Sequence, residues 1–318
     1  MNINHIGDDF NSLVELTDYF KNEQTCRDYL AYMRWGKNDS GSQNCLCPYC
    51  DCPKCYHFLD GKRYKCSTCR KIFTVKVKTL FEDTKVSLKK WFMALYLVVS
   101  HKKGISSHQL ARDIKVTQKT AWFMIKRIHK CFHIECVECL KNEVEADETY
   151  IGGKSKNKHK DKRLEGTQGR STKDKKPVFG LIERNGMAFA KVVNNTQSAT
   201  LYPIIQKSLK KNTTIYTDEY GVYVNLSAFF PHEIVIHSEG KYVIGDAHTN
   251  TMENFWSHLK RMIIGIHHWV SPKHLQLYVD SQLFRYNTRK ISEHERFNLF
   301  LHNKIDRRTT YKQLTNAS

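Results

Sequence analysis

The sequence predicts a multidomain α/β protein, in which a small metal-binding region and a helical region precede a larger α/β domain. Three observations support this fold class. Paired cysteines occupy residues 45–69, an apolar pattern of helical period covers residues 87–130, and alternating strand patterns begin at residue 143. With 318 residues, of which 40% are hydrophobic, the chain is long enough to bury the cores of two or three domains.

The charge and the cysteines restrict the classes of partner and compartment. Lys and Arg number 51 against 32 Asp and Glu, a formal net charge of +19, which favours a polyanion such as nucleic acid. The chain starts without an apolar signal segment. Its longest apolar run, Trp91 to Val99, has nine residues, whereas a membrane-spanning helix needs about 20. We therefore expect a soluble cytoplasmic protein without a membrane partner, whose eleven cysteines serve as metal ligands rather than in disulfides.

A zinc ribbon is predicted in residues 1–80, after a short helical lead-in. Cys47 and Cys50 form one C-x₂-C pair, and Cys66 and Cys69 form another after 15 intervening residues. This spacing is typical of a ribbon in which four thiolates hold one structural Zn²⁺. A domain this small needs the metal in order to fold.

Further cysteines leave alternatives to this ligand set. Cys52 and Cys55 form a C-x₂-C pair of their own, and Cys45 lies close by. We prefer Cys47 and Cys50 because CPYC is the more typical knuckle. A second cluster is interpreted as ordinary helix and linker, with a second metal site as the alternative; its members are Cys131, His133, Cys136 and Cys139.

Residues 81–140 predict a helix-turn-helix DNA-binding region. Ser87 is a good N-cap for a strongly apolar helix, and two further helices, 107–113 and 118–128, flank the turn IKVT. An ordinary helical hairpin is the alternative, since such hairpins are common. On the second of these helices we expect four side chains to face outward and contact DNA in a major groove. They are Gln118, Lys119, Lys126 and Arg127.

From residue 143 the pattern predicts an α/β domain with the element order β-β-β-α-β-α-β-α. The second and third strands are joined through Asn185-Gly186, a strong hairpin signal. Between the first two strands, residues 154–176 contain ten Lys or Arg and three acids, which predicts a loop. This basic loop either contacts DNA or only solubilises the protein.

Three carboxylates can meet in this domain. Asp147 lies on the first strand, Asp218 ends the fourth strand, and Glu253 lies on the helix after the fifth strand. Three acids at one point repel each other unless a cation is bound, and Mg²⁺ prefers oxygen ligands. Two such ions about 4 Å apart suit phosphodiester chemistry. Lys260 follows Glu253 by seven residues and so lies on the same helix face, where it can hold a phosphate.

Neighbouring residues offer alternatives to this site. Glu148 follows Asp147 directly, but side chains alternate along a strand, so we expect it to face away. Glu219 follows the second aspartate in the same way. Asn250 either joins the site or starts the helix. The pair His267 and His268 either contacts DNA or packs.

Together these stretches resemble the IS1595 family of ISXO2-like transposases. The matching stretches are CPYC…YKCSTCRKIFTV, DETYIGGK, TDEYGVY, HTNTMENFWSHLKR and HHWVSPKHLQLYVDSQLFRYNTR. The resemblance covers most of the chain and implies an RNase H-like (integrase-like) catalytic domain over residues 141–295, followed by a C-terminal tail, 296–318. The D-D-E-x₆-K pattern of the family falls on Asp147, Asp218, Glu253 and Lys260.

What the resemblance implies is a DNA transposase. It would use two Mg²⁺ or Mn²⁺ ions to cleave DNA and transfer strands of an insertion sequence. Its partners would be the terminal inverted repeats and target DNA, contacted by Lys260 and Arg261, with a homo-oligomer assembled on the DNA and, in a bacterium, association with the nucleoid. Two alternatives are an RNase H-like nuclease without strand transfer and a domesticated, non-catalytic DNA-binding regulator. The intact acidic triad argues against the regulator.

Overall fold

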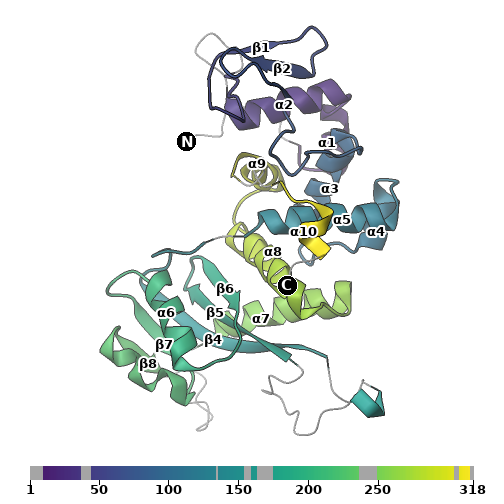
Figure 1. Cartoon of the computed structure of the whole chain (residues 1–318). Coiled ribbons are helices and arrows are strands. Elements are labelled where there is room, and N and C mark those ends of the chain that lie inside the picture. The colour runs from purple at the N-terminus through teal and green to yellow at the C-terminus, as the bar shows by residue number, and fades with distance from the viewer. Residues whose placement is uncertain are drawn as a thin grey trace. The chain divides into compact units, whose positions relative to one another are not determined.

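The computed structural model describes residues 10–36, 44–133, 135–153, 159–162, 175–235, 249–303 and 308–315. The chain divides into two compact units, residues 1–131 together with 290–318, and residues 132–289 (Figure 1). Most of the predicted basic loop 154–176 lies outside the described residues. Within the described part, no helix is long and apolar enough to cross a membrane.

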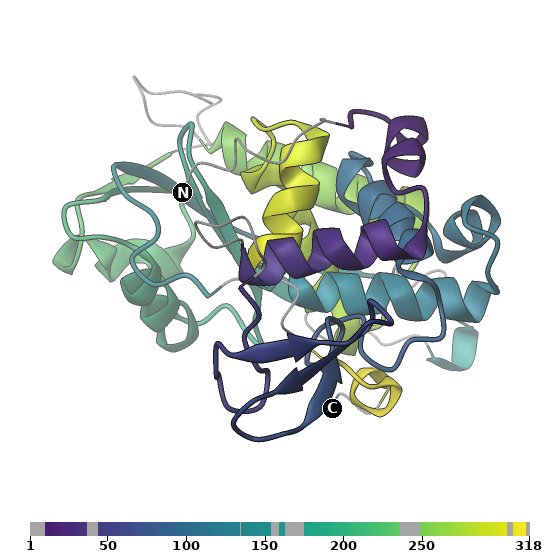
Figure 2. The same ribbon diagram turned by 90° about the horizontal axis from the view of Figure 1, so that it is seen from above.

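The first unit is built on helices that bury aromatic side chains. Three come from the first third of the chain and one from its end; they are α1 (Leu13–Tyr19), α2 (Glu23–Trp35), α3 (Leu88–Ser100) and α9 (Glu293–Asn303). Ser87 caps α3 as predicted, through a hydrogen bond from the backbone N–H of Lys90. Phe92 of α3 and Phe297 of α9 are fully buried, with ring centroids 5.6 Å apart. Figure 2 shows α9 in yellow beside the purple α2.

The predicted ribbon forms a three-stranded antiparallel sheet in this unit. Its strands are β1 (Cys55–His57), β2 (Arg63–Cys66) and β3 (Ile72–Thr74). Tyr64 and Phe73 are buried between the sheet and Trp35 at the end of α2, and the Trp35 and Tyr64 rings are 5.2 Å apart. A sheet this small buries too little apolar surface to fold on these aromatic contacts alone, so its folding depends on the metal site.

The two short helices predicted on either side of IKVT are also present. They are α4 (Ser107–Asp113) and α5 (Gln118–Cys131), and Ser106 caps the first. Gln118 and Lys119 are exposed, as expected. The prediction that Lys126 and Arg127 face outward is wrong, because these side chains are only 2% and 4% exposed.

Arg127 is buried because a segment near the end of the chain packs against α5. Its guanidinium donates to the backbone carbonyl of Thr309, at 2.7 Å, and to that of Glu82, at 3.1 Å. Just beyond Thr309 lies α10 (Tyr311–Thr315), whose Tyr311 ring contacts Phe123 of α5. The sequence pattern of α5 alone predicted that Arg127 faces solvent. In the structure, a segment 182 residues further along the chain covers it.

Lys126 should make the stability of the first unit depend on pH. Burial lowers the pKa of Lys126 from 10.5 to about 7. Between pH 7 and 10.5, Lys126 is protonated in the unfolded chain and neutral in the folded one, so the free energy of unfolding rises with pH. Below about pH 7 the folded protein also carries the buried charge, and the destabilisation reaches its full size. Lys126→Met, which keeps an apolar side chain and removes the charge, should raise the free energy of unfolding at pH 6 by about 2–4 kcal/mol.

Denaturant titrations of wild type and Lys126→Met at pH 6 and pH 10 measure this effect. We expect the advantage of the variant to be large at pH 6 and small at pH 10. An advantage of the same size at both pH values would show that Lys126 does not lose its proton on folding.

The second unit contains a mixed five-stranded sheet with the order β6-β5-β4-β7-β8. Strands β4, β5 and β6 pair antiparallel, while β7 pairs parallel with β4, and β8 with β7. The strands are β4 (Glu143–Gly152), β5 (Lys175–Glu183), β6 (Ala188–Val192), β7 (Thr214–Thr217) and β8 (His232–Ile234). The helices are α6 (Ser198–Ser208), a 3₁₀ helix (Gly221–Ala228), α7 (Asn250–Met262), a π-helical turn (Ile263–His267) and α8 (Leu275–Asn287). The predicted element order is therefore present, with the 3₁₀ segment as its second helix.

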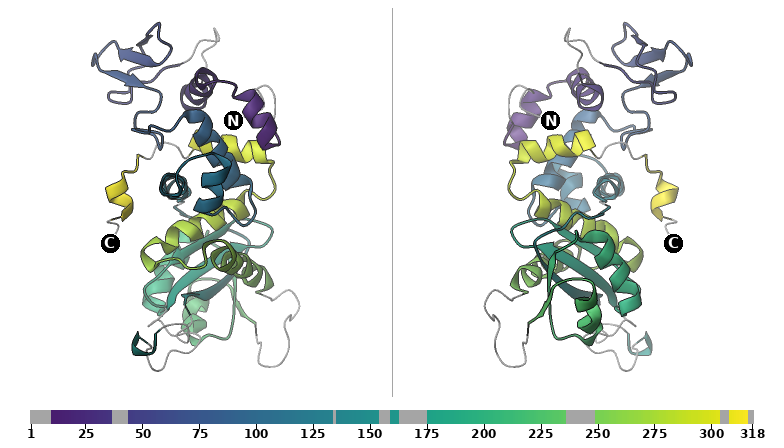
Figure 3. Two further views of the ribbon diagram at one scale, coloured as in Figure 1. Left: turned by 90° about the vertical axis from the view of Figure 1, so that its right-hand side faces the viewer. Right: turned by 90° about the vertical axis from the view of Figure 1, so that its left-hand side faces the viewer.

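Alternate side chains of the sheet face two different cores. Val178 and Ile182 pack with α7 and α8, whereas Phe179 and Leu181 pack with α6 and the 3₁₀ helix. Helices therefore cover both faces of the sheet (Figure 3). This alternation determines which residues of β4 point toward α7.

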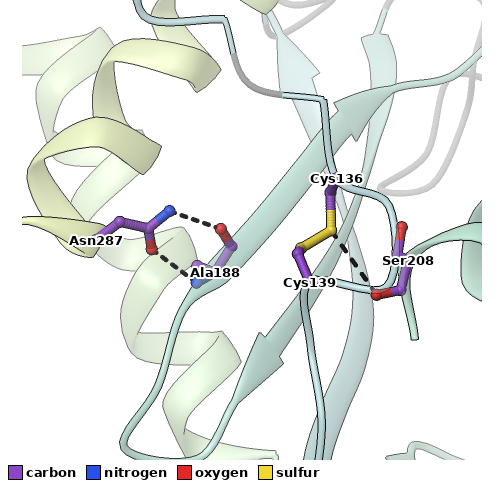
Figure 4. The surroundings of a disulfide bond; sticks show 5 residues. All are labelled: Cys136, Cys139, Ala188, Ser208 and Asn287. Carbon is purple, nitrogen blue, oxygen red and sulfur yellow. Dashed lines mark hydrogen bonds between the residues drawn. A yellow bond between two sulfur atoms is a disulfide. The ribbon is translucent and has the colours of Figure 1, made fainter. Parts of the chain in front are cut away.

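Cys136 and Cys139 form a disulfide in the segment before β4 (Figure 4). The expectation that cysteines serve only as metal ligands is wrong for this pair, because a C-x₂-C in a tight turn also brings two sulfurs within bonding distance. Cys136 is buried against the backbone carbonyl of Ser208. Among the described residues, this second cluster does not form a group of potential ligands for a metal.

Candidate active site

Four thiols meet at one end of the ribbon sheet. The sulfurs of Cys47, Cys50, Cys66 and Cys69 all lie within 4.8 Å of one another. Cys47 and Cys69 are 3.6 Å apart, as are Cys50 and Cys66. Tetrahedral zinc with Zn–S bonds of about 2.3 Å requires sulfurs about 3.8 Å apart. The arrangement therefore fits a structural Zn²⁺, and the predicted choice of thiols agrees with it.

Backbone N–H groups of each knuckle favour the thiolate form of its first cysteine. Cys66 accepts hydrogen bonds from the N–H groups of Thr68 and Cys69, at 3.3 and 3.4 Å. Burial opposes ionisation of Cys47, but the N–H groups of Tyr49 and Cys50 lower its pKa to about 7. The remaining thiols of the ribbon lie outside the cluster, and Cys52 instead accepts from Thr68 Oγ1 at 3.1 Å.

Asp147 lies on β4, and Asp218 directly follows the neighbouring parallel strand β7. Glu145 of β4 is paired with Tyr216 of β7, so extending this register by two residues sets Asp147 opposite Asp218. Both residues are half-buried. On β4, the side chain of Asp147 points to the face covered by α7, because it is paired with Gly180, between Val178 and Ile182 on that face.

Glu253 and Lys260 lie on α7, in its first and last turns, and both are exposed. Two helical turns separate them, so they share one side of the helix. The charges of Asp218 and Glu253 both act on Asp147 and raise its pKa. The three carboxylates are thus electrostatic neighbours, although their oxygens do not all lie within 4.8 Å of one another, as the four thiols do.

The environment of Asp147 raises the pKa of its carboxyl group. Burial raises its pKa to about 6, and repulsion from the other two carboxylates adds to the effect. Two donors oppose it by stabilising the anion: the backbone N–H of Glu148 at 2.7 Å and the indole N–H of Trp256 at 3.0 Å. A carboxylate held by donors while repelled by its neighbours suits a group that receives a cation.

Gly180 gives Trp256 the space to reach Asp147. A Cβ at Gly180 would lie 2.1 Å from the Met252 methyl group and 2.7 Å from the Trp256 ring. The methionine end can move, but the ring is held by the core around α7 and α8. A glycine on β5 opposite Asp147 thus allows the indole of α7 to lie against the sheet.

The residues beside the predicted ligands take different roles. Glu148 faces away from Asp147, as strand alternation predicts, and accepts a hydrogen bond from the buried Tyr223 hydroxyl on the other side of the sheet. Glu219 is exposed. Asn250 is the first residue of α7, in agreement with a role in starting the helix.

The two histidines after α7 differ from each other. His267 packs against the Tyr278 ring, with centroids 4.6 Å apart. His268 is exposed and has a positive φ of 57°. Packing therefore accounts for His267, whereas His268 belongs to the exposed turn that follows the π-helical segment.

Glu145 was not among the predicted site residues, although it is the most completely buried acid near the site. Its side chain is fully buried on the same face of β4 as Asp147. It accepts from the hydroxyl of Thr251 and the backbone N–H of Met252, both at 2.9 Å. Its position two residues before Asp147 on a strand was a signal available in the sequence.

Two family models match the chain in the regions that hold these sites. A transposase zinc-ribbon domain matches residues 21–72, which contain the four clustered thiols. An ISXO2-like transposase domain of the IS1595 family matches residues 139–287, which contain Asp147, Asp218 and Glu253.

Similar proteins agree with these matches. A protein of Halobacterium salinarum, described as an uncharacterized protein in transposable element ISH50, is 30% identical over 265 residues, which is 80% of this chain and 85% of the relative. An uncharacterized transposase-like protein of Haemophilus influenzae is 34% identical over 101 residues, 31% of this chain and 80% of that protein. A chain in the cryoEM structure of a simian T-cell lymphotropic virus intasome with PP2A regulatory subunit B56 gamma matches 55% of this chain and 63% of its own length, at 12% identity and a TM-score of 0.28. A likeness this weak supports no conclusion.

The ribbon and the mixed α/β unit are those of an insertion-sequence transposase. The chain belongs to the IS1595 family of ISXO2-like transposases. Membership of a transposase family implies a protein that binds DNA, in agreement with the net charge of +19.

Proposed function

We propose that this protein cleaves the ends of its insertion sequence and joins them to target DNA, with Asp147, Asp218 and Glu253 as metal ligands. One observation carries the proposal. Asp147 lies on β4 and Asp218 directly follows the parallel β7, Glu253 lies on the helix covering that face, and the charges of Asp218 and Glu253 raise the pKa of Asp147. Three acids that repel one another in this way gain stability when a divalent cation binds among them.

An RNase H-like fold for the second unit is part of this proposal. Its support is the mixed sheet, in which three antiparallel strands are followed by two parallel ones. The second unit's first strand, β4, is central and parallel to β7, so acids at equivalent positions of the two strands lie side by side. We also propose the domain limits 1–80, 81–140, 141–295 and 296–318.

The donor set fits Mg²⁺ or Mn²⁺, because all three side chains offer carboxylate oxygens. Asp147 and Asp218 are half-buried and Glu253 is exposed, so a bound ion can also be shared with a phosphate. When bound, a pair of such ions activates the attacking oxygen and stabilises the leaving oxygen of a phosphodiester. The chain's own groups prepare the site. Trp256 and the Glu148 backbone N–H hold the Asp147 carboxylate in one orientation.

Cationic side chains on α7 would bind the DNA backbone beside the acids. Lys260 is exposed and shares the side of α7 that carries Glu253. Arg261 is also exposed, and its guanidinium donates to Ser257 Oγ at 2.7 Å, which orients it along the helix. In the first unit, the exposed Gln118 and Lys119 at the start of α5 are the proposed contacts of a helix-turn-helix.

The test is an assay with purified protein, Mg²⁺ and DNA that carries the element's own ends, scored for cleavage and for joining to a second DNA. We expect both products with Mg²⁺ or Mn²⁺ and neither with EDTA. Cleavage without joining would instead favour a nuclease without strand transfer. Tight DNA binding without either product would favour a non-catalytic regulator and contradict the proposal.

A further inference from the structure

Glu145 is a buried acid that the proposed chemistry does not use. Its side chain is fully buried, and a carboxylate in such a place is costly unless its charge is paired and its oxygens accept hydrogen bonds. Arg184 supplies the charge, with its Nε 3.3 Å from Glu145 Oε1. Two further hydrogen bonds to Glu145 come from α7, and these connect it to the helix that carries Glu253.

Both contacts from α7 lie in its first turn. Thr251 Oγ1 donates to Oε1 and the Met252 backbone N–H donates to Oε2, each at 2.9 Å. The helix has no cap of its own here, because the side chain of Thr249 at the N-cap makes no capping hydrogen bond. The first N–H groups of a helix need an acceptor, and they favour a negative charge. Glu145, 107 residues earlier on β4, provides both the acceptor and the negative charge at the start of α7.

The hydrogen bond from the Met252 N–H to Glu145 affects the position of Glu253. Glu253 follows Met252 directly, so the hydrogen bond from the Met252 N–H to β4 also holds Glu253 close to the strand that carries Asp147. One turn further, Trp256 donates to Asp147 itself. Helix α7 is thus attached to β4 at two points, one on each side of Glu253.

We propose that Glu145 is a positioning residue for metal binding, which fixes the start of α7 so that Glu253 meets Asp147 and Asp218. This inference rests on the proposed function of the three acids. Glu145 itself is not a ligand, since its two oxygens receive the hydroxyl, the backbone N–H and the guanidinium. Loss of a residue that orients metal ligands typically lowers metal affinity about 10–100-fold.

The experiment measures Mn²⁺ affinity by electron paramagnetic resonance, together with the Mn²⁺ dependence of DNA cleavage, in the full-length protein. In Glu145→Gln the amide keeps one acceptor but cannot accept at both positions and carries no charge. We expect Mn²⁺ to bind about 10–100-fold more weakly, and saturating Mn²⁺ to restore much of the cleavage rate. A purely structural role would lower the melting temperature without this recovery by metal.

Glu143→Gln is the matched control. Glu143 lies on the same strand and faces the same Arg184, at 3.6 Å, but its other contact is the Tyr216 hydroxyl of β7 rather than α7. It should bind Mn²⁺ as the wild type does. Equal Mn²⁺ affinity in Glu145→Gln and the wild type would overturn the inference.

Thr251→Val provides the decisive variant if Glu145→Gln does not fold. It removes one donor to Glu145 and leaves the buried charge paired with Arg184 and capping Met252. A several-fold weaker Mn²⁺ affinity supports the inference, and an unchanged affinity overturns it. Failure of the proposed function looks different, because then the wild type itself would bind no Mn²⁺ that depends on Asp147.

Discussion

Replacing Glu253 with Gln should lower DNA cleavage and joining by about 10³-fold or more, while DNA binding persists. The change keeps the size of the side chain and nearly the same helix propensity. Glu253 is exposed in the first turn of α7, so the fold loses only a weak interaction with the helix dipole. What the change removes is the charged oxygen that we propose as a metal ligand beside Asp147. DNA binding should stay the same or tighten slightly, because a negative charge near phosphates is gone.

Asn250→Ala provides the comparison for this result. Asn250 lies one helical turn before Glu253, at the first residue of α7, and is exposed. Its loss should reduce activity only mildly. Near wild-type cleavage and joining by Glu253→Gln would make Glu253 an ordinary surface residue. Metal-dependent activity abolished in Asn250→Ala but retained in Glu253→Gln would move the third ligand to Asn250.

Replacing Cys66 with Ser should release zinc and unfold the ribbon, while the second unit stays folded. Cys66 is a buried member of the four-thiol cluster, and a serine hydroxyl is a poor ligand for zinc. Structural zinc contributes about 10–16 kcal/mol to the folding of small ribbons, which is more than their apolar contacts supply. Since the sheet of residues 143–234 has its own cores, it does not depend on this metal.

Metal analysis and hydrogen exchange measure the two parts of this prediction. Zinc content should fall from one ion per chain in the wild type, and amide protection should be lost in residues 55–74 but kept in β4 and β5. Cys52→Ser is the control, because Cys52 lies outside the cluster and should retain zinc. Full zinc in Cys66→Ser would contradict the assignment of ligands.

Local sequence patterns predicted the four-thiol cluster, the start of a helix and a hairpin correctly. The spacing of the four cysteines predicted the cluster, Ser87 predicted the start of α3, and Asn185-Gly186 predicted the hairpin. Each of these depends on residues close together in the chain. The direction of Glu148 was predicted for the same reason, because alternation along a strand is local.

Contacts between distant segments account for what the sequence did not reveal. Arg127 was expected outside because its helix alone offers no reason for burial, and its partner, Thr309, is 182 residues away. Phe297 is in the core of the first unit although it lies near the chain's end. Glu145 is paired with the start of α7 across 107 residues. No local pattern specifies such pairings, because they follow from the tertiary fold.

We propose above all that Asp147, Asp218 and Glu253 together bind divalent metal. Fe²⁺ substituted for Mg²⁺, with ascorbate and peroxide, releases hydroxyl radicals that cut the polypeptide next to the bound ion, and mass spectrometry of the fragments locates the cuts. We expect cuts close to all three residues, suppressed by excess Mg²⁺ and absent in Asp147→Asn. Cuts confined to other positions, or cuts at these three that persist in Asp147→Asn with excess Mg²⁺, would contradict it.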